Sequence, residues 1–333
     1  MVTEVDIKMR ADQLAGWAPI RLYWQQSSAF MDWCHLGERR FTDPFFDQTV
    51  ERCLSHPFNL LFRHQTPIDV VGWWHEESPG LRPTGFIFHL SRCGSTLISQ
   101  MLAALPQNVV ISEASPIDSV LRARFHNPGV TDEMRAAWLQ WVISALGQRW
   151  SGDEKYLFIK FDSWSAIDLR IIKRAFPGVP WIFVYRDPVE VLVSQLKRRG
   201  AHMVPGMMEP EFLGVDRLSI LHMQPEEFCA RVLAGVCDAA LRHQERGEAM
   251  LVNYRQLPDA VWSSLLDFFR VEYTAADVEI MRRTSQFNAK NPSLRFENDT
   301  ASKNREASDE LRAVVNKWVM PLYERLEATR LAL

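Results

Sequence analysis

The chain has 333 residues, of which 47% are hydrophobic, and its formal net charge is −3. This length fits one large domain or two small ones, and the hydrophobic content is ordinary for a globular core. The negative net charge argues against a general nucleic-acid-binding protein, which usually has a basic surface. The apolar runs are too short to span a bilayer.

Cysteine and histidine usage narrows the chemistry further. The five cysteines are scattered and odd in number, which suits a reducing compartment better than a disulfide framework. The first ten residues mix charged and apolar side chains without the apolar core of a signal peptide. We therefore expect a cytoplasmic protein. The histidines show no metal-ligand spacing, so the sequence predicts no metal site.

Residues 1–80 are rich in tryptophan and phenylalanine. Weak helical periodicity over 21–36 and 43–55 predicts a helical N-terminal extension packed on a main domain of residues 81–333. Aromatic clusters are more often core than binding site, so we favour a packing role. A substrate lid is the alternative.

From about residue 84 the chain alternates strand-like and helix-like segments. Continuous apolar strands between helices predict an α/β fold, a three-layer sandwich whose central parallel sheet is covered on both faces. Ligands of such sheets bind at the C-terminal ends of the strands. The predicted strands are Gly85–Leu90, Asn108–Ser112, Tyr156–Lys160, Trp181–Tyr185 and Ala249–Asn253.

The remaining segments are more irregular. Residues 200–224 contain Gly, Pro and four methionines, and could be either a mobile loop over a site or a surface insertion. Thr274 and Asp277 form a capping box for one helix. Residues 288–308 read as a polar loop, and 311–327 as a closing helix that completes a helical C-terminus.

The most informative segment lies between the first predicted strand of the main domain and the helix after it. It holds Arg92, Gly94, Ser95 and Thr96. A strand, a tight loop and a helix N-terminus form an anion cradle, because the first backbone N–H groups of a helix lack partners. The loop is not a Walker A motif, since Ser95 and not lysine follows the glycine and the cation precedes it.

A second anion-binding pattern ends another strand. Arg186 follows the strand at 181–185, Pro188 suits the first turn of a helix, and Ser194 lies eight residues after Arg186. Two helical turns separate those residues, so both side chains can face the same side. A surface Arg–Asp pair is the alternative.

Together these patterns resemble the family of sulfotransferases that use 3′-phosphoadenosine-5′-phosphosulfate (PAPS), which has a P-loop-type fold. Arg92, Gly94, Ser95 and Thr96 match the Arg-x-Gly-Ser/Thr-Thr form of bacterial, tyrosylprotein and Golgi members. The resemblance covers roughly residues 84–270.

The resemblance implies roles for several residues. The loop from Arg92 through Cys93 to Leu97 would hold the 5′-phosphosulfate. Arg186 and Ser194 would bind the 3′-phosphate. Tyr254 would lie near the adenine.

The resemblance also implies which residues would lie near the sulfuryl group that is transferred. Lys160 would lie near the sulfuryl group, and Arg92 would stabilise charge on the leaving phosphate. Many members carry a histidine two residues after the lysine, where this chain has Asp162. Other members use a glutamate after the second strand, which Glu113 matches. We prefer Glu113 as the base, with Asp162 as the alternative.

Two further positions depart from the family pattern or extend it. Eukaryotic cytosolic members have an Arg-Lys-Gly segment near the C-terminus that grips the 3′-phosphate, whereas this chain offers Lys303 and Arg305. Cys93 lies beside Arg92 at a helix N-terminus, a setting that lowers a thiol pKa. It is either a redox-active thiol or, as we favour, a small residue that fits the turn.

The sequence therefore predicts transfer of a sulfuryl group from PAPS to a hydroxyl or amine of a small-molecule acceptor, with 3′,5′-adenosine bisphosphate (PAP) as product. The alternatives are a kinase-like P-loop phosphoryl transferase and a non-catalytic nucleotide-binding protein. Neither nucleic acid nor a membrane span is expected, and a homodimer is left open.

Overall fold

The computed structural model describes residues 14–206, 217–244, 247–297 and 299–332. Its central sheet has five parallel strands in the order β5-β6-β4-β7-β8. These strands are β4 (Pro83–His89), β5 (Asn108–Ser112), β6 (Tyr156–Lys160), β7 (Trp181–Tyr185) and β8 (Ala249–Asn253). The predicted parallel α/β sheet is confirmed.

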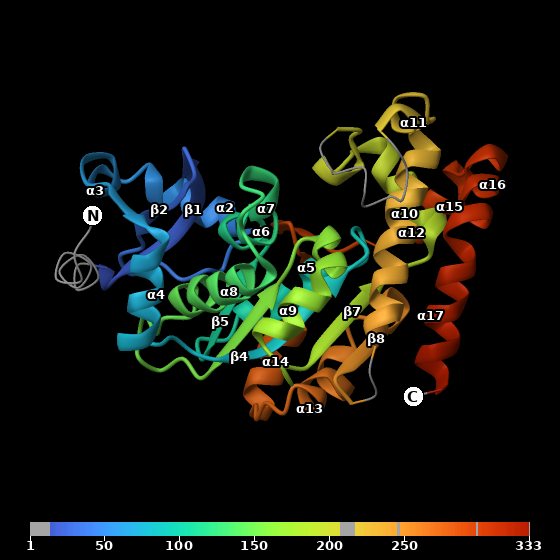
Figure 1. Cartoon of the computed structure of the whole chain (residues 1–333). Helices are drawn as coiled ribbons and strands as arrows, with labels where there is room; N and C mark the ends of the chain where they lie inside the picture. Colours follow the sequence, from blue (N-terminus) through green and yellow to red (C-terminus); the bar gives the residue numbers. More distant parts are fainter. Residues whose placement is uncertain (1–13, 207–216, 245–246, 298, 333) are drawn as a thin grey trace.

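Helices cover both faces of this sheet (Figure 1). Successive strand residues point to opposite faces, so Phe86 and Phe88 enter one core cluster and Ile87 enters the other. The first cluster includes residues of α8 (Asp132–Leu146), α9 (Leu169–Ala175), α10 (Pro188–Lys197) and α12 (Pro225–His243). The second includes residues of α5 (Ser95–Ala103), η6 (Val261–Leu265), α13 (Leu266–Phe268) and α14 (Ala275–Thr284). The predicted three-layer sandwich is confirmed.

The prediction of a helical N-terminal extension is wrong for its first part. Residues 21–36 lie in an antiparallel sheet, because their apolar residues repeat every second position: Ala29, Met31 and Trp33 are buried and alternate with more exposed neighbours. The strands are β1 (Trp17–Gln25), β2 (Ser28–His35) and β3 (His64–Pro67). Helices α2 (Phe46–Leu54), α3 (Pro57–Leu61) and α4 (Ile68–Glu77) complete the region, and α2 confirms the helix predicted over 43–55.

This N-terminal region packs on the main domain (Figure 1). Trp33 and Met31 belong to the same core cluster as Phe86 of β4. Helix α4 lies against α8, where Trp141 fills the space that a side chain at Gly72 would need. The buried aromatic residues are therefore part of a continuous core.

Short helices follow two of the central strands. After β5 come α6 (Ser115–Leu121) and α7 (Ala123–His126), and after β6 comes η2 (Ser163–Asp168). The segment at 200–224 contains η3 (Ala201–Met203) and α11 (Arg217–Leu221), while residues 207–216, with two of its methionines, lie outside the described residues. The capping box of Thr274 and Asp277 begins α14 as predicted.

The chain closes with α15 (Thr300–Glu306), α16 (Asp309–Trp318) and α17 (Met320–Ala332), which confirms a helical C-terminus. The prediction of a polar loop over 288–308 is wrong. A hairpin of β9 (Phe287–Asn288) and β10 (Asn291–Arg295) precedes α15, and elements this short leave little periodicity to read. None of the helices among the described residues is long and apolar enough to cross a membrane.

Candidate functional site

A cavity of about 680 Å³ opens at the C-terminal ends of the central strands. Its volume is in the range of small-molecule sites. It brings together the loop after β4 and the residues Arg186 and Ser194 after β7. Of the predicted site residues, the lining includes Arg92, Cys93, Gly94, Ser95, Thr96, Leu97, Glu113, Arg186, Ser194, Tyr254 and Lys303.

The loop between β4 and α5 has the geometry of an anion cradle. Ser91, Arg92 and Gly94 have φ values of 48°, 52° and 88°, a left-handed backbone that turns the chain sharply into α5. A side chain at Gly94 would lie 2.9 Å from Leu257 Cδ1 and 3.0 Å from Tyr254 Cδ2, so only glycine fits. The first N–H groups of α5 therefore begin directly at the cavity.

Arg92 reaches from this loop to the segment after α10. Its Nη2 donates a hydrogen bond of 2.7 Å to the backbone carbonyl of Arg198. The neighbouring Cys93 is fully buried, and its Sγ donates to the Val184 carbonyl of β7 at 3.1 Å. Burial raises the pKa of Cys93 to about 11, against the low pKa expected from the helix N-terminus. The thiol is thus protonated at neutral pH, which disfavours the redox-active alternative and agrees with the small residue fitting the turn that we favour.

Lys160, His89 and Glu113 form a buried polar cluster beneath the loop. Lys160 at the end of β6 is fully buried, and its Nζ bonds to the Glu113 carboxylate. His89 Nδ1 accepts the Ser91 N–H at 3.1 Å, so Nε2 carries the proton, 3.1 Å from the Phe161 carbonyl oxygen and 3.4 Å from Glu113 Oε1. Both nitrogens of His89 are therefore engaged.

These contacts decide the ionisation of the two predicted bases. Burial alone would raise the pKa of Glu113, but the charge of Lys160 and the hydrogen bond from His89 hold it well below its usual range. A carboxylate with so low a pKa is a weak proton acceptor. Burial, with the charges of Glu113 and Asp118, holds the pKa of Asp162 well above its usual range. Asp162 is not one of the described residues that line the cavity.

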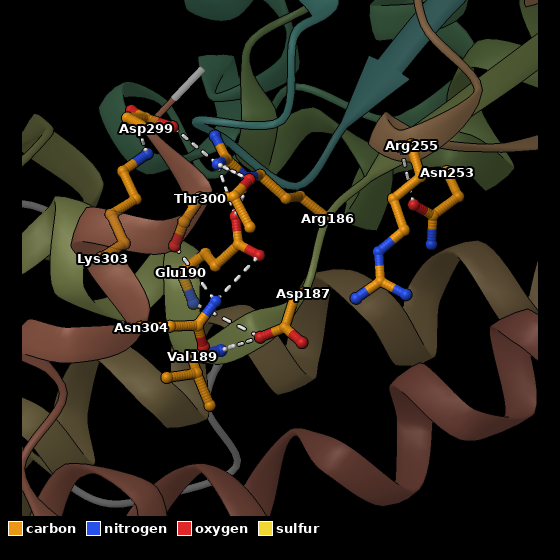
Figure 2. Close-up of polar contacts among 10 residues, drawn as sticks. All are labelled: Arg186, Asp187, Val189, Glu190, Asn253, Arg255, Asp299, Thr300, Lys303 and Asn304. Carbon is orange, nitrogen blue, oxygen red and sulfur yellow. Dashed lines mark hydrogen bonds and ion pairs between the residues drawn. The ribbon is translucent and has the colours of Figure 1, made fainter.

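Arg186 occupies the second predicted anion site, but two carboxylates already hold it (Figure 2). Its Nε donates to Glu190 Oε2 and its Nη2 to Asp299 Oδ1, both at 2.6 Å. The Tyr254 ring lies 4.1 Å from the guanidinium carbon. Asp299 also forms an ion pair with Lys303, whose Nζ lies 2.7 Å from Asp299 Oδ2. Asp299 thus stands between the two cations predicted to bind one phosphate.

The alternative of a surface Arg186–Asp187 pair does not describe this arrangement. Asp187 instead caps α10, accepting the Val189 N–H at 2.9 Å. Arg186 itself is 4% exposed. Arg305 lies exposed on α15 and is not among the described residues that line the cavity.

The cavity is locally basic although the whole chain is slightly acidic. Its lining contains six lysines and arginines against three carboxylates among the described residues. The cations are Arg92, Arg186, Arg198, Arg199, Lys290 and Lys303, and the acids are Glu113, Glu297 and Asp299. Such a surplus favours an anionic ligand.

Many lining residues escaped the sequence analysis, and three of them carry titratable groups with lowered pKa values: His89, His202 and Lys290. Lys290 comes from the β9–β10 hairpin, and its Nζ lies 5.4 Å from the centre of the Phe45 ring. Burial and the charges of Arg92 and Lys160 lower the pKa of Lys290 to about 8. The one sequence signal for His202 was its place in the Gly- and Pro-containing segment at 200–224.

Within the part of the chain that the structure describes, no group of three or more histidine, cysteine or acidic side chains is arranged to hold a metal ion.

No family model and no curated protein matches the chain. Solved structures do. They include a sulfotransferase from Alicyclobacillus acidocaldarius (18% identity, 75% of this chain and 96% of that chain covered, TM-score 0.44). They also include the sulfotransferase domain of the Synechococcus PCC 7002 olefin synthase (16% identity, 76% of this chain and 96% of that chain covered, TM-score 0.42). A third is sulfotransferase STF9 from Mycobacterium avium (13% identity, 96% of this chain and 97% of that chain covered, TM-score 0.41). Similarity at this level carries no conclusion about activity.

Proposed function

We propose that the protein transfers a sulfuryl group from PAPS to a hydroxyl or amine of a small-molecule acceptor. The observation that carries this proposal is the meeting of two anion-binding strand ends in one basic cavity. The loop from Arg92 to Thr96 and the pair Arg186 and Ser194 line the same space. The spacing of these residues resembles that of PAPS-dependent sulfotransferases.

The residues present fit such a donor. The buried hydroxyls of Ser95 and Thr96 and the first N–H groups of α5 would bind the 5′-phosphate. Arg186 and Lys303 would bind the 3′-phosphate, and Tyr254 would lie against the adenine. The donor supplies an activated sulfuryl group whose leaving phosphate gains negative charge, so stabilisation of that charge by Arg92 accelerates transfer.

Lys160 and Glu113 have a supporting place in this scheme. Fully buried, Lys160 forms an ion pair with Glu113 beneath the loop, so it is not free to bind solvent. The pairing also fixes the Glu113 carboxylate at the cavity wall. Loss of either partner would leave the other as an uncompensated buried charge.

A phosphoryl transferase that uses ATP is the competing function. It is disfavoured because Ser95 stands where a Walker lysine would follow the glycine. A nucleotide-binding protein without activity remains the second alternative, and it predicts bisphosphate binding without turnover.

Thermal unfolding separates these functions. Since a ligand stabilises the folded state that binds it, PAP at about 100 times its Kd should raise Tm by about 4 °C. ATP with magnesium is the matched comparison. A shift with ATP and magnesium alone would overturn the proposal. A shift with PAP and no consumption of PAPS, with water or added phenols as acceptors, would favour the inactive alternative.

A further inference from the structure

Resting on the proposed sulfuryl transfer, the further question is which group takes the proton of the acceptor. Glu113 is committed to Lys160, and both nitrogens of His89 are used. Asp162 is not part of the described cavity lining. A proton acceptor must lie at the cavity with a free lone pair.

His202 lines the cavity and has a ring nitrogen without a hydrogen-bond partner, although in the free protein that nitrogen is covered and lies beside Gly200. Its side chain is 5% exposed. Its Nε2 lies 3.2 Å from Ser163 Oγ. Among the polar side-chain atoms of the described residues, its Nδ1 is one of the few that are buried without a hydrogen-bond partner. A buried nitrogen left unpaired costs free energy unless another group uses it.

The segment that carries His202 is held against the anion loop. Gln195, which is fully buried, donates to Ser91 Oγ at 2.7 Å and accepts the Gly200 N–H at 3.0 Å. Arg92 holds the Arg198 carbonyl on the same segment. The loop that would bind the donor therefore also sets the position of His202.

The far side of the same turn is anchored in the core. Met203 is buried, and the Cys229 thiol lies 3.8 Å from its carbonyl. The Trp164 ring packs 5.0 Å from the imidazole, centre to centre. These contacts leave the ring few alternative orientations.

We propose that His202 is the general base, accepting the acceptor's proton on Nδ1 while Nε2–H donates to Ser163 Oγ. In the step, the acceptor O–H bond breaks and its proton moves to Nδ1. The acceptor oxygen forms a bond to sulfur, and the bond from sulfur to the bridging oxygen breaks. The electron pair of that bond leaves on the phosphate, next to Arg92. An amine acceptor follows the same balance through its N–H bond.

The charge environment keeps this imidazole neutral at pH 7. Burial and His89, then Arg92 and Arg122, lower the pKa of His202 to about 4, and Glu113 opposes them. A donor anion at the loop offsets the positive charge of Arg92, which strengthens the base when the donor is bound. His202 is thus an unprotonated but weak base in the free protein, and the bound donor makes it a stronger one.

The first test reads the tautomer directly and needs no acceptor. In protein labelled with ¹⁵N-histidine, the His202 signals are assigned by their loss in His202→Asn. The proposal requires Nδ1 to be unprotonated and Nε2 protonated at pH 7. A proton on Nδ1 would overturn it, because Ser163 would then be the donor and the free lone pair would be gone.

The second test measures turnover as PAP released from PAPS, with 2-naphthol as the probe acceptor and water as the background acceptor. His202→Asn should lower kcat by about 10²- to 10⁴-fold. It should also abolish the fall in kcat at acid pH, while the Tm shift with PAP stays unchanged. His75→Asn is the matched control, since His75 Nδ1 is likewise buried and unpartnered but lies on α4, away from the described lining.

The outcomes separate this inference from the function on which it rests. Absence of a PAP shift in the unaltered protein contradicts the proposed function itself. A PAP shift with equal kcat and pH profile in His202→Asn contradicts only the role of His202. If neither acceptor supports turnover, the tautomer measured by NMR decides.

Discussion

The two regions of the cavity that are predicted to bind anions differ in how their positive charge is balanced. The loop after β4 presents the N–H groups of α5 and the hydroxyls of Ser95 and Thr96 to the cavity. At the end of β7, Arg186 is already paired with Glu190 and Asp299. The first region is prepared for an anion, whereas the second must exchange an internal carboxylate for one. The proposed phosphate recognition would therefore be split between a preformed site and a displaceable contact.

The largest effect that would sharpen this comparison is expected for Arg186→Ala. Removing the cation leaves Glu190, 2% exposed, as an uncompensated buried charge, so we expect a loss of about 3–5 kcal/mol in the free energy of unfolding. Denaturant unfolding measures this loss. Adding Glu190→Gln should restore most of the stability but not the PAP affinity. A double variant that binds PAP normally would place the 3′-phosphate elsewhere.

Arg92→Ala tests the preformed side. Because in the proposed reaction this cation would stabilise the charge that develops on the leaving phosphate, we expect kcat to fall by about 10²- to 10³-fold, with PAPS as donor. Arg92→Lys should recover part of the rate. Arg199→Ala removes another lining cation and serves as the control. An equal loss in both alanine variants would mean that only the overall positive charge matters.

A smaller effect of opposite sign is expected for Asp299→Asn. The side chain of Asp299 is half exposed, so its pairs with Arg186 and Lys303 are worth about 1 kcal/mol or less. Freeing both cations should tighten PAP binding by up to about fivefold. Calorimetric titration measures the affinity, and Glu297→Gln controls for general charge. Weaker binding in Asp299→Asn would show that Asp299 orders the site.

The smallest expected effect concerns pH. Lys290 faces the cavity, and its pKa is lowered to about 8. As pH rises through 8 the ammonium loses its charge, so PAP affinity should fall by about twofold to fivefold between pH 7 and 9. Lys290→Met should flatten this dependence in the same titrations. A slope that persists in Lys290→Met would assign the pH dependence to another group.

Several features of the fold follow from local sequence patterns. The strand at 181–185 has the predicted bounds, because five consecutive apolar residues fit a strand buried on both faces. The capping box of Thr274 and Asp277 formed as predicted, since both partners lie within one turn. By contrast, the antiparallel pairing of β1 and β2 was missed, although alternate burial of Ala29, Met31 and Trp33 was readable at period two.

The sequence by itself placed Arg92 and Gly94 in a loop before a helix that begins at Ser95, and Arg186 at the end of a strand, because each depends on neighbours only a few residues away. Parallel strands then bring their ends to one edge of the sheet.

Only the tertiary structure decided how those charges are balanced. Lys160 pairs with Glu113, 47 residues away, and Arg186 with Asp299, 113 residues away. The segment that carries His202 is held at the cavity by Gln195, which bonds both to Gly200 of that segment and to Ser91 of the loop after β4. Contacts between such distant residues leave no local periodicity, so the ionisation of the site is a property of the folded chain.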